Sequence, residues 1–69
     1  MTLRGFKAGL PERNGLYVFH NNVGDVLISV FCVFRQGTHF FVEDPESQEH
    51  TPLANFSRFF SVAGHKEVL

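Results

Sequence analysis

The most apolar stretch of the chain is Val26-Leu27-Ile28-Ser29-Val30-Phe31-Cys32-Val33-Phe34-Arg35. Alternate residues of a β-strand point to opposite faces, and one face of this stretch consists only of apolar side chains. Its other face is interrupted only by Ser29 and Arg35. A strand that is apolar on both faces is normally central in its sheet or covered on both sides. The stretch therefore predicts a central strand over 26–35.

Shorter segments on either side of this stretch have the composition of strands. Residues 16–20 and 39–43 are rich in β-branched and aromatic side chains. Turn-forming residues separate them from the central segment, at 21–25 and at 36–38. A three-stranded antiparallel meander over 14–43 is the arrangement that these spacings predict.

The remaining segments give weaker patterns. Asp44-Pro45-Glu46-Ser47 has the residues of a type I turn, and the polar segment 48–50 fits either an edge strand or a loop. Before the meander, residues 1–13 contain glycines and a proline that break any helix. We expect an extended arm or a short turn there that wraps the domain.

The C-terminal part of the chain fits two periodicities. Thr51 as a cap, Pro52 at the first helical position and Gly64 past the end frame a helix over 51–63. Its apolar stripe consists of Leu53, Phe56, Phe60 and Ala63. Strand-like alternation is also present, at Phe56, Arg58, Phe60 and Val62. We expect the helix, followed by a loose tail over 64–69.

Together these elements predict an α+β fold in which a small three-stranded antiparallel sheet carries one C-terminal helix. The alternative, if the last segment is a strand, is a small all-β barrel. The length of 69 residues predicts a single domain over 1–69. One helix covers only one face of the sheet, so the other face would expose aromatic side chains to water. A homodimer or a bound partner would cover that face.

Composition and charge exclude several classes of function. Lys plus Arg is 6 and Asp plus Glu is 7, so the formal net charge is −1. This balance argues against nonspecific binding to nucleic acid or acidic membranes, and equally against a DNA mimic. The single cysteine excludes an internal disulfide and a multi-cysteine zinc site. Phenylalanine, in contrast, occurs 9 times, which is a large supply of apolar surface for so short a chain.

No set of residues forms a catalytic or metal-binding motif. The histidines lack close ligand spacing; they are His20, His39, His50 and His65. Cys32 lies between apolar neighbours, where a thiol is usually inert. The carboxylates of 43–49 surround a turn and are expected to be solvated. We therefore expect no enzyme activity, no bound metal and no cofactor.

The chain shows no sign of membrane insertion or export. No apolar segment follows Arg4 and Lys7 that would serve as the core of a signal peptide. The longest apolar run has about half of the roughly 20 residues that a spanning helix needs. We expect a cytoplasmic protein that does not enter a membrane.

These observations favour a non-enzymatic protein that binds another protein. Aromatic residues are enriched at the energetic centres of interfaces, and the acidic turn could orient a basic partner surface. The predicted interaction residues are Tyr17, Phe19, Phe31, Phe41, Glu43, Asp44 and Glu46.

The alternative function is binding of single-stranded nucleic acid through the face of the sheet. Tyr17 and Phe40 would then stack on bases. The phosphates would be held by Arg4, Lys7, Arg13 and Arg35. With a net charge of −1, nucleic acid is the less favoured partner.

One resemblance to known proteins suggests a source. Leu10-Pro11 and Gly15-Leu16-Tyr17-Val18 resemble the opening of short phage and prophage proteins of unknown function. His50-Thr51-Pro52-Leu53 is similar to their ending, although the tryptophan of that ending is missing here. The resemblance implies a phage or mobile-element origin. It further implies an accessory protein that blocks or modulates a host protein, such as a component of a defence system, in the host cytoplasm.

Overall fold

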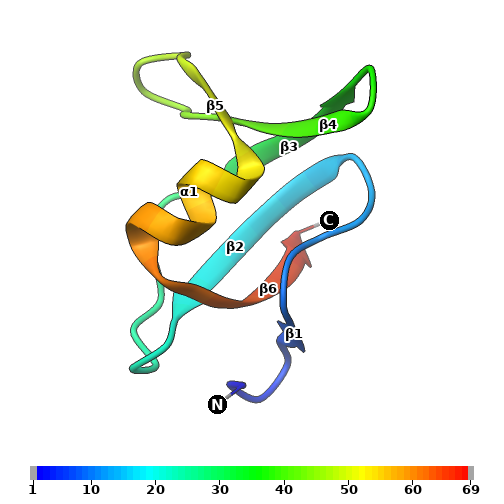
Figure 1. Ribbon diagram of the computed structural model, residues 1–69. Coiled ribbons are helices and arrows are strands. Elements are labelled where there is room, and N and C mark those ends of the chain that lie inside the picture. The colour runs from blue at the N-terminus through cyan, green and yellow to red at the C-terminus, as the bar shows by residue number, and fades with distance from the viewer. Residues whose placement is uncertain (1, 69) are drawn as a thin grey trace.

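The computed structural model describes residues 2–68, and this part of the chain forms mostly β-sheet. Six strands form one antiparallel sheet in the order β1-β6-β2-β3-β4-β5, with α1 between β5 and β6 in the chain (Figure 1). The elements are β1 Lys7–Ala8, β2 Gly15–Asn21, β3 Phe31–Gln36, β4 His39–Glu43, β5 His50–Pro52, α1 Leu53–Phe60 and β6 Val62–Val68.

The predicted three-stranded sheet with a C-terminal helix is therefore wrong, and the all-β alternative fits better. The largest difference is β6, which covers most of the segment expected to be a loose tail. It pairs with β2 from Leu16↔Val68 to Asn21↔Val62, with one irregularity near the end of β2. Backbone pairing with a distant strand, rather than an apolar pattern, holds this polar segment in place. Leu69 lies outside the described residues.

Of the two periodicities of the C-terminal part, the helical one describes residues 53–60. The helix spans Leu53–Phe60 and is shorter than the predicted 51–63. It ends at Ser61, which has a left-handed backbone (φ 53°) and whose N–H bonds back to Arg58 O and Ser57 O. The chain then continues as the strand β6, but of the residues that alternate only Val62 belongs to it; Phe56, Arg58 and Phe60 lie in α1. At the other end, Thr51 belongs to β5, where it pairs with Val42.

The central strand begins later than predicted, at Phe31 rather than Val26. Asn21 bends the chain after β2, because its side-chain oxygen accepts the N–H groups of Val23 (3.1 Å) and Asp25 (2.9 Å). Only an isolated bridge between His20 and Val26 continues the pairing into the segment that follows. Residues 22–30 therefore form a loop in which several apolar side chains are exposed; they are Val23, Val26, Ile28 and Val30.

The other local predictions are close to the structure. β4 has the predicted bounds, and β2 is one residue longer at each end than predicted. Segment 48–50, left open as an edge strand or loop, contributes His50 to the edge strand β5. The N-terminal arm contains a turn in which the N–H of Phe6 bonds to Leu3 O (3.0 Å), and its residues Lys7 and Ala8 pair with β6.

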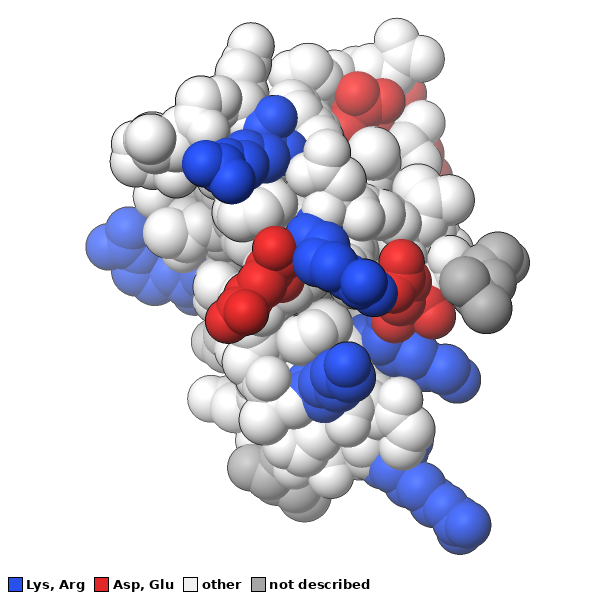
Figure 2. Space-filling model, turned by 90° about the vertical axis from the view of Figure 1, so that its right-hand side faces the viewer, with Lys and Arg blue, Asp and Glu red and all other residues white. Residues whose placement is uncertain are grey.

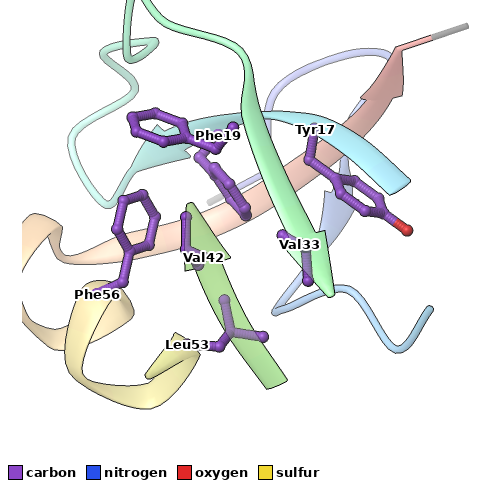
Figure 3. Packing of buried hydrophobic residues seen from close by; sticks show 7 residues of the cluster. Tyr17, Phe19, Val33, Val42, Leu53 and Phe56 are labelled. Carbon is purple, nitrogen blue, oxygen red and sulfur yellow. The ribbon is translucent and has the colours of Figure 1, made fainter. Parts of the chain in front are cut away.

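The hydrophobic core lies between α1 and one face of the sheet (Figure 3). Phe56 of α1 contacts the rings of Phe19 (centroids 5.2 Å apart) and Phe31 (4.9 Å). The buried apolar residues are Tyr17, Phe19, Phe31, Val33, Val42, Leu53 and Phe56. We call the face that α1 covers the inner sheet face.

The predicted turn after β4 is built on one side chain. Oδ1 of Asp44 accepts the N–H groups of Glu46 (2.8 Å) and Ser47 (3.2 Å), which fixes the start of the β4–β5 connection. We expect Asp44→Ala to lower the free energy of unfolding by about 1 kcal/mol, because these backbone donors lose their partner. Urea denaturation would measure the loss. Asp44→Asn keeps the acceptor and should stay near wild type; equal losses in both variants would contradict this role.

Candidate interaction surfaces

Three of the four aromatic residues predicted to bind a partner are part of the core. The exposed fractions are 3% for Tyr17, 0% for Phe19 and 6% for Phe31. They all point to the inner sheet face, which α1 covers. These rings therefore offer no surface to a partner, and the prediction is corrected. The fourth, Phe41, is half-buried on the opposite face, where it stacks with Phe34 (centroids 5.9 Å apart).

The predicted acidic residues lie at the surface, but two of them make bonds within the chain. Glu43 Oε1 lies 3.0 Å from Nε2 of His50 across the β4–β5 pair. Asp44 holds the following turn through its side chain. Glu46 is exposed. Together with Glu49, these residues form an acidic end of the sheet, at the β4–β5 connection, which we call the acidic turn.

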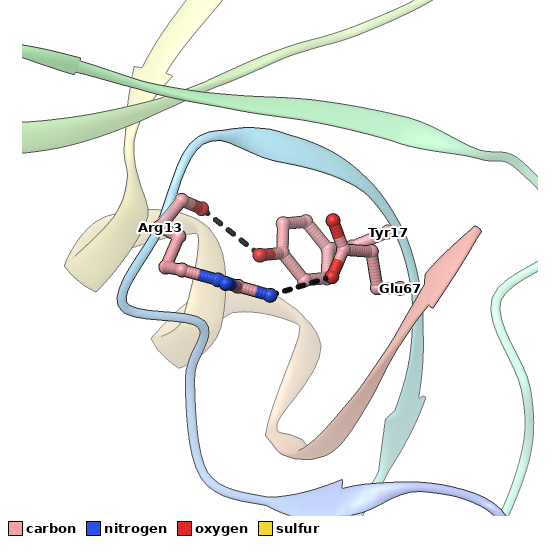
Figure 4. Close-up of polar contacts among 3 residues, drawn as sticks. All are labelled: Arg13, Tyr17 and Glu67. Carbon is pink, nitrogen blue, oxygen red and sulfur yellow. Dashed lines mark hydrogen bonds and ion pairs between the residues drawn. The ribbon is translucent and has the colours of Figure 1, made fainter. Parts of the chain in front are cut away.

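The residues proposed to stack on nucleic acid bases are not free to do so. Tyr17 is buried, and its hydroxyl donates a hydrogen bond to the carbonyl of Arg13 (3.0 Å; Figure 4). Phe40 packs against the core. Figure 4 also shows the ion pair between Arg13 and Glu67 (3.1 Å), in which the Arg13 side chain is largely solvated and the Glu67 side chain is partly buried. Tyr17 thus joins the 9–14 loop to β2.

Basic and acidic groups alternate on the side of the molecule shown in Figure 2. A hollow of about 700 Å³ lies between the 9–14 loop and strands β1 and β6. Its charged lining residues are Lys7, Glu12, Arg13, Lys66 and Glu67. Because Glu67 already pairs with Arg13 and Glu12 adds a further negative charge, the lining does not form a continuous basic field.

His20 is fully buried, and the contacts of its ring are structural. Its Nδ1 lies 2.9 Å from the carbonyl of Asn21 and its Nε2 accepts the N–H of Leu3 (3.3 Å). Phe6 meets the ring edge to face (centroids 4.9 Å apart). On its other side lies Gly64 of β6. The ring therefore holds the N-terminal arm against β2 and β6.

Cys32 and the histidines do not converge on a metal site. Cys32 is half-buried and stands opposite Leu16 on one side and Glu43 on the other. Within residues 2–68, no three His, Cys, Asp or Glu side chains come close enough to hold an ion. The eight-residue helix in this part of the chain is too short to span a membrane.

The face of the sheet opposite α1, which we call the outer sheet face, carries a band of apolar side chains. Leu16 is 48% exposed, and its neighbours in the band are half-buried. The band consists of Leu16, Val18, Cys32, Phe34, Phe41 and Val68. The face that α1 does not cover is thus apolar, but its aromatic side chains, Phe34 and Phe41, are half-buried rather than exposed as expected.

A second apolar surface lies at the end of α1. Phe59 is 80% exposed and Phe60 is 38% exposed, with ring centroids 4.8 Å apart. We call this pair the helix-end surface. Phe59 was not among the predicted interaction residues. Its position outside the apolar stripe that was predicted to face the sheet could have indicated that it is exposed.

Comparison of the chain with family models, curated proteins and solved structures finds no match. The proposals below therefore start from the residues and geometry of this chain.

Proposed function

We propose that this protein is a non-enzymatic binding protein that acts by occupying a surface of another protein. The observation that carries the proposal is the helix-end surface. Phe59 is 80% exposed, whereas Leu53 and Phe56 of the same helix are buried and Phe60 packs against Phe56. A large exposed aromatic ring gains free energy when a partner buries it, and such rings often dominate an interface.

The surroundings of Phe59 indicate the chemistry of the partner. Arg58 is the neighbouring residue, and it is exposed with one bond from its Nη2 to Asn55 Oδ1 (3.3 Å). Its remaining guanidinium N–H groups are suited to a carboxylate. The proposed partner therefore offers an apolar pocket for the ring with an acidic group at the rim. The resemblance to short phage proteins makes a host protein the partner that we favour.

Capture from a bacterial lysate tests this function. We expect the tagged chain to retain one stoichiometric protein, and Phe59→Ala to weaken this binding by about 30-fold or more, as loss of a central interface residue does. Phe59→Tyr keeps the ring and should bind nearly as the wild type does. Because residue 59 is exposed, both variants should unfold at the wild-type urea concentration.

Two results would contradict the proposal. One is capture of the same protein by wild type and Phe59→Ala in equal amounts. The other is loss of all captured material after nuclease treatment, which would support the nucleic acid alternative.

A further inference from the structure

The register of the sheet aligns one residue from each of five strands across the outer sheet face. Leu16 lies opposite Val68 on one side and Cys32 on the other. Cys32 in turn lies opposite Glu43, which lies opposite His50. The row therefore reads Val68, Leu16, Cys32, Glu43, His50. Cys32 is its middle member.

The apolar band extends to both sides of this row. On one side is an apolar hollow of about 530 Å³, to whose lining Phe6, Val18 and Val26 contribute. On the other side, Phe34 stacks with Phe41. The face is thus apolar over β2 and β3, Glu43 and His50 make the row polar at its β4–β5 end, and no helix or loop of the described chain covers Leu16.

The two ends of the outer sheet face carry opposite charges. The acidic turn follows Glu43, so it extends beyond the row at the β4–β5 end. Lys66 stands at the β6 end, opposite Val18, and its side chain is exposed. Val18 and its partner Lys66 lie two residues from the row, on the same side of it. β4 runs in the same direction as β2, because each is antiparallel to β3, so the residues that follow Glu43 leave the row on that side too. Lys66 and the acidic turn therefore lie on the same side of the row.

We propose that a second copy of this chain covers the outer sheet face, related to the first by a two-fold axis that runs parallel to the strands near Cys32. Rotation about this axis lays the β6 end of one copy over the β4–β5 end of the other. Each Lys66 then faces the acidic turn of the other copy, and this contact forms twice. An axis across the strands would instead place β6 over β6 and would bring no opposite charges together.

This arrangement satisfies the requirements of a closed dimer. A two-fold interface uses the same patch on both copies, so the patch must be complementary to itself. An apolar middle with opposite charges at its two ends has this property, and complementary charges select one orientation over others. Cys32 and Phe34 lie near the axis, and Leu16 contacts the strand β4 of the other copy.

The proposal is independent of the proposed function. The helix-end surface belongs to α1, which lies on the inner sheet face, so a dimer through the outer sheet face leaves Phe59 free. Loss of the dimer by substitution of Leu16, with binding through Phe59 retained, would separate the two.

Cross-linking of Cys32 tests where the axis lies. Cys32 is the chain's single cysteine. We expect a short bismaleimide to link two copies, giving a band at twice the chain mass in denaturing gels. Sedimentation equilibrium of the untreated protein should also give the mass of a dimer. A protein that stays monomeric at the highest soluble concentration, or a dimer that Cys32 does not cross-link, would overturn the proposal.

Substitutions test which face and which charges are used. Leu16→Asp should weaken the dimer by about tenfold or more, whereas Phe59→Asp, the matched control on the other face, should leave it unchanged. Lys66→Glu should weaken the dimer by about tenfold, since two contacts are reversed. Combining it with Glu46→Lys should restore most of the affinity. Far-UV circular dichroism would check that each variant is folded. A dimer that depends on Phe59 instead of Leu16, or no recovery in the double variant, would refute this geometry.

Discussion

Replacing Phe56 with alanine is expected to lower the free energy of unfolding by about 3–5 kcal/mol. The ring is 5% exposed and contacts Phe19, Phe31 and Phe60. It is the aromatic contact through which α1 reaches the inner sheet face, so the cavity left by its removal has a rigid lining on both sides. A chain of this length has a total stability of roughly 3–10 kcal/mol. The substitution therefore removes a large part of it.

The matched control is Phe59→Ala, which makes the same chemical change on the same helix. Because Phe59 is 80% exposed, its loss should change stability by less than about 0.5 kcal/mol. Urea denaturation followed by far-UV circular dichroism measures both, and fluorescence of Tyr17 provides a second probe, since the chain has no tryptophan. Similar losses in the two variants would mean that α1 is not held to the sheet by the Phe56 ring.

Gly64→Ala is expected to lower the free energy of unfolding by about 1–3 kcal/mol through overpacking. A Cβ at this position would overlap Nε2 of His20 and lie 2.9 Å from the carbonyl oxygen of Lys7. The His20 ring cannot withdraw easily, since it is fully buried and both of its nitrogens have hydrogen-bond partners. The backbone of Lys7 is fixed by its pairing with β6.

Gly15→Ala is the matched control for this prediction. Gly15 is also a strand glycine, but the atom nearest to an added Cβ is Oε2 of Glu67, at the end of a flexible side chain. We expect a smaller loss there. In a His20→Ala background, the cost of Gly64→Ala should also fall, because the main obstacle is gone. Thermal denaturation of the four proteins of this cycle measures the coupling; strictly additive losses would exclude a direct clash between residues 20 and 64.

The parts of the fold that depend on nearby residues were predictable. Residues 39–43 form a strand with the predicted bounds, and Asp44 closes the turn that its type and the following proline indicated. These features arise from local preferences, namely β-branched and aromatic side chains in the strand and a side-chain acceptor in the turn. Such preferences act within a few residues and do not require knowledge of the rest of the chain.

The prediction of a strand over the whole stretch 26–35 was wrong, because an apolar pattern does not show which residues will pair with another strand. The side chain of Asn21 closes a turn that places 22–30 outside the regular ladder, so only the second half of the stretch is a strand. β6 was missed for the opposite reason. Its sequence has no regular apolar alternation, and it is a strand because β2, more than 40 residues earlier in the chain, provides its hydrogen-bond partners.

The candidate interaction residues also depend partly on local pattern and partly on tertiary packing. Tyr17 and Phe19 are two residues apart in their strand and therefore share a face, but the sequence does not show whether that face is covered. The position of α1 decided it: the rings became core, while Leu16 and Phe59, on the outer sheet face and on the far side of the helix, became exposed.

By itself, the sequence determined that this is a small chain rich in phenylalanine, with near-neutral charge and strands at 16–20 and 39–43. Those properties follow from composition and short-range periodicity. The tertiary structure alone decided the six-strand order and the sides of the sheet that face α1 and solvent. The physical reason is that strand pairing and burial are long-range: each depends on the free energy gained when segments far apart in the chain meet.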